Sequence, residues 1–78
     1  MRKDIFLKKL GEHIRALRKK NNLTQVELAN LMGKDRQSLQ RIELGIINPS
    51  AYYLLEIAKA LDISLKTLLD FDIEDKKK

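Results

Sequence analysis

The sequence predicts an all-α fold of five short helices in one small domain. Apolar residues recur at the three- and four-residue spacing of amphipathic helices, and the alternation that is typical of strands is nearly absent. Residues that begin or end helices stand at intervals along the chain, and they are Thr24, Gly33, Asp35, Gly45, Ser50 and Ser64. We expect a single domain over residues 1–73 and a charged, disordered tail at residues 74–78.

The composition excludes several classes of protein. The chain has 78 residues and no cysteine, so neither a disulfide scaffold nor a thiolate metal site is expected. Its longest apolar run, residues 51–55, is far shorter than the roughly 20 residues of a membrane span. The first residues do not resemble a signal peptide, so a cytoplasmic protein is expected. The net charge of +5 indicates a polyanionic partner only weakly.

The first helix is predicted to end at Asn21 and Asn22. Leu10, Ile14 and Leu17 recur at i, i+4 and i+7, which places them on one apolar stripe. Basic residues lie off this stripe, and residues 1–20 hold eight Lys and Arg against two acids. Asparagine tolerates the left-handed conformation in which helices often end.

The second helix is predicted to begin after Thr24. Thr24 and Glu27 have the spacing of a capping box, in which each residue hydrogen-bonds to the backbone of the other. Leu28, Ala29 and Leu31 are expected to point inward, and Gly33 closes the helix.

Three further helices follow in the same way. Asp35 caps a third helix that runs to about Leu44, where Gly45 stops it. A turn at residues 48–50 precedes the fourth helix, and Ser64 caps the last. The apolar residues at helical spacing in these two helices are Leu54, Leu55, Ala58 and Leu61, then Leu65, Leu68 and Leu69.

Residues 24–32 and 35–44 form the pattern of a helix-turn-helix, because two short helices are joined by about three residues that include a glycine. The second helix of this motif can enter the major groove of DNA. On a helical wheel, one arc of this helix holds Arg36, Gln37, Gln40 and Arg41, and the opposite arc holds Ser38, Leu39 and Ile42. Arginine suits guanine edges and glutamine suits adenine edges, although a polar arc alone is also typical of any surface helix.

The motifs resemble the Cro and phage-repressor type of helix-turn-helix, often called XRE-like. The resemblance spans about residues 8–70. It rests on Leu10-Gly11-x-x-Ile14-Arg15-x-Leu17-Arg18, Leu23-Thr24-Gln25-Val26-Glu27-Leu28-Ala29, Gly33, Arg41-Ile42-Glu43-x-Gly45, Asn48-Pro49-Ser50 and Leu54-x-x-Ile57-Ala58-x-x-Leu61. It implies a compact five-helix, lambda-repressor-like domain with the helix-turn-helix in helices two and three.

The resemblance also implies roles for individual residues. Arg36, Gln37 and Arg41 match base-reading positions, although Arg41 could equally bind a phosphate. The residues expected to contact the DNA backbone or flanking positions are Gln25, Lys34, Ser38 and Gln40. Arg18 and Glu43 match a structural ion pair between the first helix and the end of the third.

The chain departs from the family after the third helix. Leu44, Ile46 and Ile47 stand where the family commonly has polar or basic residues that contact phosphate. Two interpretations remain open: weaker or more selective DNA binding, or an exposed apolar patch that meets a protein partner.

The chain is predicted to form a homodimer through its last helix. This helix has more apolar residues than it needs to pack onto its own core, and they are Leu65, Leu68, Leu69 and Phe71. The leading hypothesis is a sequence-specific regulator of transcription, a repressor or autoregulator, that reads a palindromic operator as a dimer. The alternative is a protein-interaction module, such as an antitoxin or controller protein, that binds a toxin or the transcription machinery. An enzyme, a cofactor and a metal are not expected, because His13 is the only histidine and no catalytic set is present.

Overall fold

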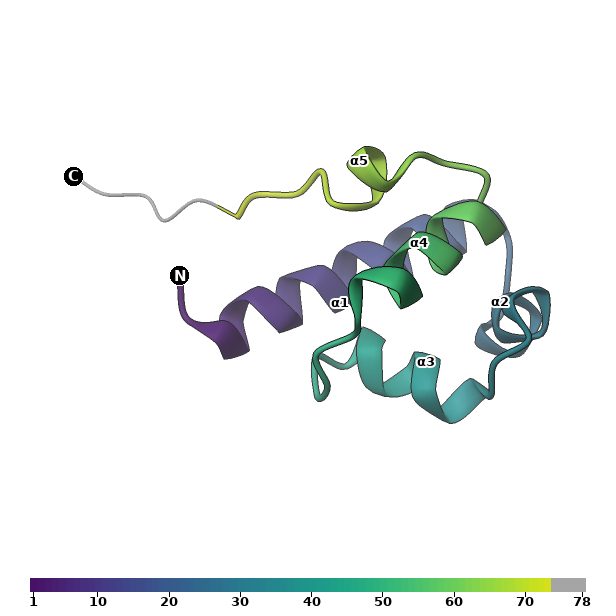
Figure 1. Cartoon of the computed structure of the whole chain (residues 1–78), viewed down its shortest axis with the longest axis horizontal. Helices are drawn as coiled ribbons and strands as arrows, with labels where there is room; N and C mark the ends of the chain where they lie inside the picture. The colour runs from purple at the N-terminus through teal and green to yellow at the C-terminus, as the bar shows by residue number, and fades with distance from the viewer. Residues whose placement is uncertain (74–78) are drawn as a thin grey trace.

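The computed structural model describes residues 1–73 and confirms the all-α fold (Figure 1). Its helices are α1 (Lys3–Lys20), α2 (Gln25–Met32), α3 (Arg36–Glu43), α4 (Ala51–Ala60) and α5 (Leu65–Leu68), and residues 1–73 contain no strand. The tail predicted for residues 74–78 lies outside the described residues. Within the described part, no helix is both long enough and apolar enough to cross a membrane.

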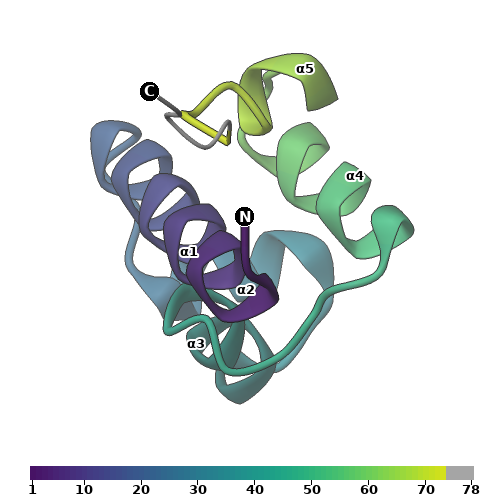
Figure 2. The same cartoon turned by 90° about the vertical axis from the view of Figure 1, so that its left-hand side faces the viewer.

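The long helix α1 organises the packing. Both α3 and α5 pack against α1, while α2 packs against α3 and α4, and α4 packs against α5. The two views place α3 on one side of α1 and α4, and α5 on the opposite side (Figures 1 and 2). One side of the molecule is therefore formed by α3, and α5 covers the other.

The core lies between these helices and draws on all five. Its largest fully buried side chains are Leu10, Ile14, Leu28, Leu39, Ile42, Ile57 and Leu68. Each fully buried Leu or Ile contributes about 1.5–3 kcal/mol to stability relative to an exposed one. The predicted apolar stripe of α1 is therefore confirmed at Leu10 and Ile14, and Leu17 packs against the core while half-buried.

One predicted inward residue of α2 is wrong. Leu31 is 62% exposed, whereas Leu28 and Ala29 are buried and Met32 packs against the core. At about 100° per residue, Met32 lies between the directions of Leu28 and Ala29, while Leu31 lies on the outer side of Leu28, about 160° from Ala29. The inward face of α2 is therefore narrower than its leucine content suggests.

Two glycines allow α1 to approach the end of α3 at backbone contact. A Cβ atom on Gly11 would collide with the backbone carbonyl oxygens of Ile42 and Glu43. A Cβ on Gly45 would lie 2.8 Å from the Cα atom of Lys8, and Gly45 also has a left-handed φ of 76°. The main chains of α1 and α3 therefore meet without side chains between them.

The predicted starts of α4 and α5 and the predicted end of α1 are confirmed. Ser50 and Ser64 each accept a hydrogen bond from the backbone N–H three residues later, both at 3.0 Å. Asn22, just past the end of α1, has a φ of 59° in the left-handed region. These elements are thus bounded by local hydrogen bonds that the residue types already indicate.

The segment around α5 packs onto α1 through aromatic contacts. The ring of Phe71 lies 5.8 Å from that of Phe6 and 5.3 Å from that of His13, between ring centroids. His13 Nε2 also lies 3.2 Å from the backbone oxygen of Thr67. His13 therefore joins α5 to α1, and the described residues contain no group of three or more His, Cys, Asp and Glu side chains that could hold a metal.

Candidate nucleic-acid interface

The start of α2 is fixed by the capping box that the sequence predicts. The Glu27 N–H donates to Thr24 Oγ1 at 3.1 Å, and the Thr24 N–H donates to Glu27 Oε1 at 2.8 Å. These reciprocal bonds place Gln25 at the first position of the helix. Its side chain is therefore held at the end of α2 where backbone N–H groups lack helical partners.

The turn between α2 and α3 has three residues, 33–35. Gly33 has a φ of 67°, and the Lys34 N–H donates to the Ala29 carbonyl at 2.9 Å, as in a Schellman motif. Asp35 then begins α3, because its Oδ2 accepts from the Ser38 N–H at 3.0 Å. Two helices capped at this short turn have the geometry of the predicted helix-turn-helix.

The two faces of α3 differ in chemistry. Leu39 and Ile42 are buried in the core, while Arg36, Gln37 and Arg41 are exposed. The three residues predicted to read bases therefore lie together on the open face of α3. Their side chains offer guanidinium donors and an amide, and no acid stands on this face between them.

Arg18 and Glu43 form the ion pair that joins α1 to the end of α3. Arg18 Nε donates to Glu43 Oε2 at 2.7 Å and Nη2 donates to Oε1 at 2.9 Å, a bidentate contact. The side chains are only 7% and 2% exposed. Arg18 Nη1 also donates to the Leu23 carbonyl at 2.8 Å, which anchors the segment before α2. The hydrogen bonds to Glu43 raise the pKa of the Arg18 guanidinium.

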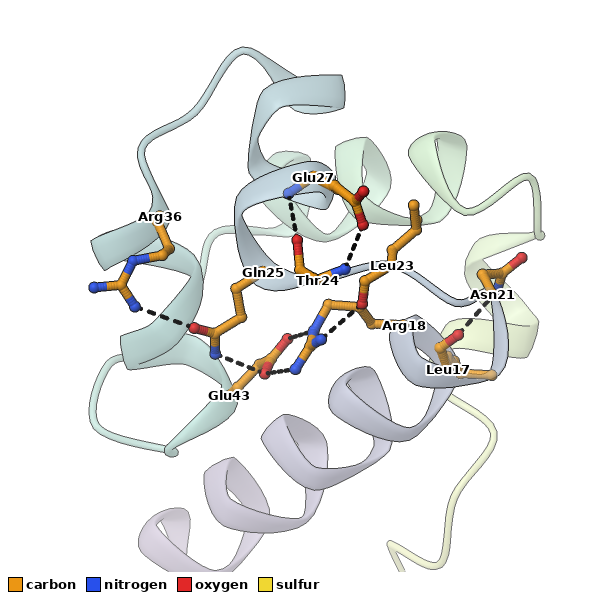
Figure 3. A network of polar contacts seen from close by, with 9 residues as sticks. All are labelled: Leu17, Arg18, Asn21, Leu23, Thr24, Gln25, Glu27, Arg36 and Glu43. Atoms are coloured by element: carbon orange, nitrogen blue, oxygen red, sulfur yellow. Dashed lines mark hydrogen bonds and ion pairs between the residues drawn. The ribbon is translucent and has the colours of Figure 1, made fainter.

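Gln25 connects this ion pair to the open face of α3 (Figure 3). Its Nε2 donates to Glu43 Oε1 at 3.0 Å, and its Oε1 accepts from Arg36 Nη1 at 3.3 Å. A carboxylate only accepts and a guanidinium only donates, so these two neighbours fix which way the amide points. The second N–H of the Gln25 amide is not used by either contact. We call Arg18, Gln25, Arg36 and Glu43 the polar network.

The other residues predicted to contact DNA divide into two groups. Gln40 lies beside the polar network, because its Oε1 accepts from Arg36 Nη1 at 3.4 Å. Lys34 and Ser38 instead face α4: Lys34 Nζ lies 3.3 Å from Glu56 Oε1, and Ser38 Oγ lies 2.7 Å from Tyr53 Oη. The structure therefore brings Gln25 and Gln40 together with Arg36, and it does not bring Lys34 or Ser38 there.

The acids of the helix-turn-helix are all engaged in structural roles. Glu27 closes the capping box, Asp35 caps α3, and Glu43 pairs with Arg18. The hydrogen bond from the Ser38 N–H lowers the pKa of Asp35 below its ordinary value of 3.8. The cationic and amide side chains on the open face are therefore left to dominate the chemistry of this surface.

The predicted dimer residues are largely used by the fold itself. Leu68 is fully buried, so it has no surface to offer a partner and is removed from the predicted interface. Leu65, Leu69 and Phe71 are half-buried and pack against the core, which leaves part of each side chain uncovered. The last helix has many apolar residues for its length because, although it has only four residues, it covers one end of the core.

The loop after α3 is apolar and open. Leu44 is 58% exposed, Ile46 is 65% exposed and Ile47 is 37% exposed. No cation stands within residues 44–47, which we call the apolar loop.

Comparison with known proteins assigns the fold to a family. The sequence profile of the helix-turn-helix family matches residues 14–68, which include the whole of α2, α3 and α4. The chain belongs to this family. Its members are DNA-binding regulators of transcription and not enzymes, so the predicted family, fold and class of function are confirmed.

Two curated relatives illustrate the range of similar proteins. The chain is 38% identical over 60 residues to an immunity repressor of Bacillus phage phi105, covering 77% of this chain and 42% of the relative. It is 33% identical over 63 residues to the antitoxin PezA of Streptococcus pneumoniae, covering 81% of this chain and 40% of the relative. The chain thus spans about two fifths of the length of these curated relatives.

A solved structure is similar over most of its own length. The restriction-modification controller protein C.AhdI from Aeromonas hydrophila aligns with a TM-score of 0.78 and 40% identity. The alignment covers 80% of this chain and 94% of that protein.

Sequence reasoning missed the bridge that Gln25 makes. Gln25 contacts a residue 18 positions away and another 11 positions away. Its position at the start of α2 indicated a phosphate contact, but no spacing rule relates it to Glu43. Only the packing of α2 across the end of α3 brings these side chains together.

Proposed function

We propose that residues 1–73 form one DNA-binding domain of a cytoplasmic regulator of transcription, a repressor or autoregulator. It reads a palindromic operator in double-stranded DNA as a homodimer. In each protomer α3 enters the major groove, and Arg36, Gln37 and Arg41 contact base edges. Gln25 and Gln40 contact the backbone or flanking positions, and the Arg18–Glu43 pair sets the angle of α3.

The observation that supports this proposal most strongly is the open face of α3. It presents arginine and glutamine side chains, while the nearby acid Glu43 is buried and neutralised by Arg18. An unpaired carboxylate at that position would repel phosphates, so its pairing favours a surface that approaches DNA.

Selection of binding sites from random duplex DNA tests this proposal. We expect the selected sequences to share a palindrome with half-sites about one helical turn apart. Gln37→Ala and Arg41→Ala should each relax the preference at particular positions, with a cost of about 1–3 kcal/mol for each lost base contact. Lys59→Gln on α4 serves as the control. Failure to enrich any sequence, with binding insensitive to salt, would contradict base reading.

The homodimer is tested by sedimentation. The uncovered parts of Leu65, Leu69 and Phe71 support an interface at α5, and two copies are needed to read a palindrome. We expect a dimer at micromolar concentration that Leu69→Asp shifts to monomer. A wild-type chain that sediments as a monomer, both free and with operator present, would contradict the dimer.

A second candidate function is a protein-interaction module. The exposed Leu44, Ile46 and Ile47 favour it, and one relative is named an antitoxin. If this function is correct, Ile46→Asp should abolish partner binding while Gln37→Ala leaves it unchanged. The reverse pattern, measured on DNA, favours the operator-binding function.

A further inference from the structure

A basic stripe on α1 borders the helix-turn-helix. Lys8, Glu12, Arg15 and Lys19 follow one another at intervals of four, three and four residues, which places them along one face of the helix. At 1.5 Å per residue, this stripe extends about 16 Å along α1. We call these four residues the α1 stripe. They lie off the apolar stripe that faces the core.

The α1 stripe lines two grooves that meet beside the polar network. The first groove has a volume of about 650 Å³, and its cationic lining residues are Arg15, Arg18, Lys19 and Arg36, with no acid among the residues that line it. The second has a volume of about 480 Å³ and is lined by Lys8, Glu12 and Arg15 on α1. Arg15 and Gln25 line both grooves. One continuous trough therefore runs from α1 to the start of α3.

Three of the cations that line the trough, all of them on α1, are not neutralised within the fold. Among the residues described, Lys8, Arg15 and Lys19 make no ion pair or side-chain hydrogen bond. Arg18 and Lys34 differ in this respect, because each already pairs with a carboxylate. These three cations along the trough, opposed by the single exposed acid Glu12, form a concave basic surface that attracts a polyanion.

We propose that this trough binds the sugar–phosphate backbone of the DNA strand that flanks the bases read by α3. Arg15 and Lys19 contact phosphates in the first groove, and Lys8 extends the contact into the second. The proposal rests on the DNA-binding function proposed above. The trough opens beside Gln25 and Arg36, so a strand lying in it continues directly to the base-reading face.

The trough also accounts for a deficit elsewhere on the surface. The apolar loop supplies no cation next to α3, so a cationic phosphate contact beside α3 comes from another element. The free cations adjacent to α3 are on α1. Glu12 limits the strength of this contact, because a carboxylate within the stripe repels phosphate.

The experiment measures the salt dependence of DNA binding. The variant Arg15→Gln/Lys19→Gln is compared with wild type and with Lys59→Gln, which removes an exposed cation of α4 that lines neither groove. Each phosphate contact contributes about −0.9 to the slope of log K against log salt concentration. We expect the double variant to reduce the slope by about 2 and to weaken all sequences alike. We expect Lys59→Gln to leave the slope unchanged.

A second variant tests the same trough in the opposite direction. Glu12→Gln removes the acid of the stripe, so it should tighten binding severalfold without changing base preference. All three substituted residues are exposed, and unchanged thermal unfolding midpoints of both variants verify the fold. A wild-type slope in the double variant, with no gain in Glu12→Gln, overturns the trough while leaving operator binding intact. Absence of salt-dependent binding in the wild type overturns the proposed function and the trough together.

Discussion

The polar network and the apolar loop lie at the same edge of the helix-turn-helix but are built in opposite ways. In the polar network, every side chain is hydrogen-bonded: Arg18 pairs with Glu43, and Gln25 links that carboxylate to Arg36. In the apolar loop, Leu44 and Ile46 are more than half exposed and no residue carries a charge. The side chains of the polar network hold one another in a fixed geometry, whereas those of the apolar loop leave apolar surface exposed to solvent.

The difference separates specificity from affinity. Paired and hydrogen-bonded side chains hold Arg36 in a defined position before any ligand arrives, which favours selective contacts. Phosphate contacts position a protein and strengthen binding without carrying sequence information. A chain that positions Arg36 in this way and leaves its loop uncharged is expected to bind DNA selectively and, from this edge, weakly.

Breaking the polar network at its centre has the largest expected effect. Arg18→Met leaves the Glu43 carboxylate buried and unpaired, so we expect a loss of about 3–5 kcal/mol in the free energy of unfolding. Urea denaturation measures it. The double variant Arg18→Met/Glu43→Leu removes both charges and should recover much of the loss. An unchanged urea midpoint in the single variant would contradict a structural role for the pair.

Removing the link between the ion pair and α3 has a smaller effect. Gln25→Leu removes a hydrogen bond to a carboxylate and one from a guanidinium at a half-buried position. We expect a loss of about 1.5 kcal/mol in the free energy of unfolding. Binding-site selection should also show relaxed preference at the same positions that Arg36→Ala relaxes. Selected sites identical to wild type would mean that Gln25 does not position Arg36.

Charging the apolar loop sharpens the comparison further. Ile46→Lys places a cation beside α3 at a position that is 65% exposed, so the fold should tolerate it. We expect the salt-dependence slope of DNA binding to steepen by about 1, with base preference unchanged. Ile46→Gln controls for the loss of apolar surface. A slope that stays at the wild-type value would place the loop away from the phosphates.

The smallest expected effect is a dependence of stability on acid pH. The pKa of Asp35 is lowered by the hydrogen bond from the Ser38 N–H. Asp35 therefore contributes stability above its ordinary pKa of 3.8, and that contribution disappears as pH falls through the lower folded-state pKa. Asp35→Asn keeps a capping side chain that does not titrate. Thermal unfolding is measured from about pH 5 to about pH 2, a range that spans the ordinary Asp pKa. The unfolding midpoint should fall less steeply with decreasing pH in Asp35→Asn than in wild type.

The fold was predictable because the ends of its helices are determined by residue types that act locally. The capping box joins Thr24 and Glu27, which are only three residues apart. Gly33 and Ser50 likewise act on residues close to them in the sequence. Such contacts depend little on the rest of the chain. The order and approximate ends of the helices therefore follow from the sequence.

The site was predictable in a different way. The pairing of Arg18 with Glu43 spans 25 positions and came from resemblance to a family, since no spacing rule connects the two residues. The bridge at Gln25, the exposure of Leu31 and the contact of Lys34 with Glu56 depend on how helices cross in space. Helix crossing depends on long-range packing, which periodicity alone does not contain.

Because of Gly11, the distance between α1 and α3 is set by contact between their main chains. Because α1 and α3 touch through backbone atoms at this point, changes of rotamer cannot alter the distance between the two helices. Side chains on the α1 stripe and on α3 can therefore be exchanged over evolution while their separation stays constant. A new operator can therefore be matched by exchanging side chains on these two surfaces, without any change in the separation of α1 and α3.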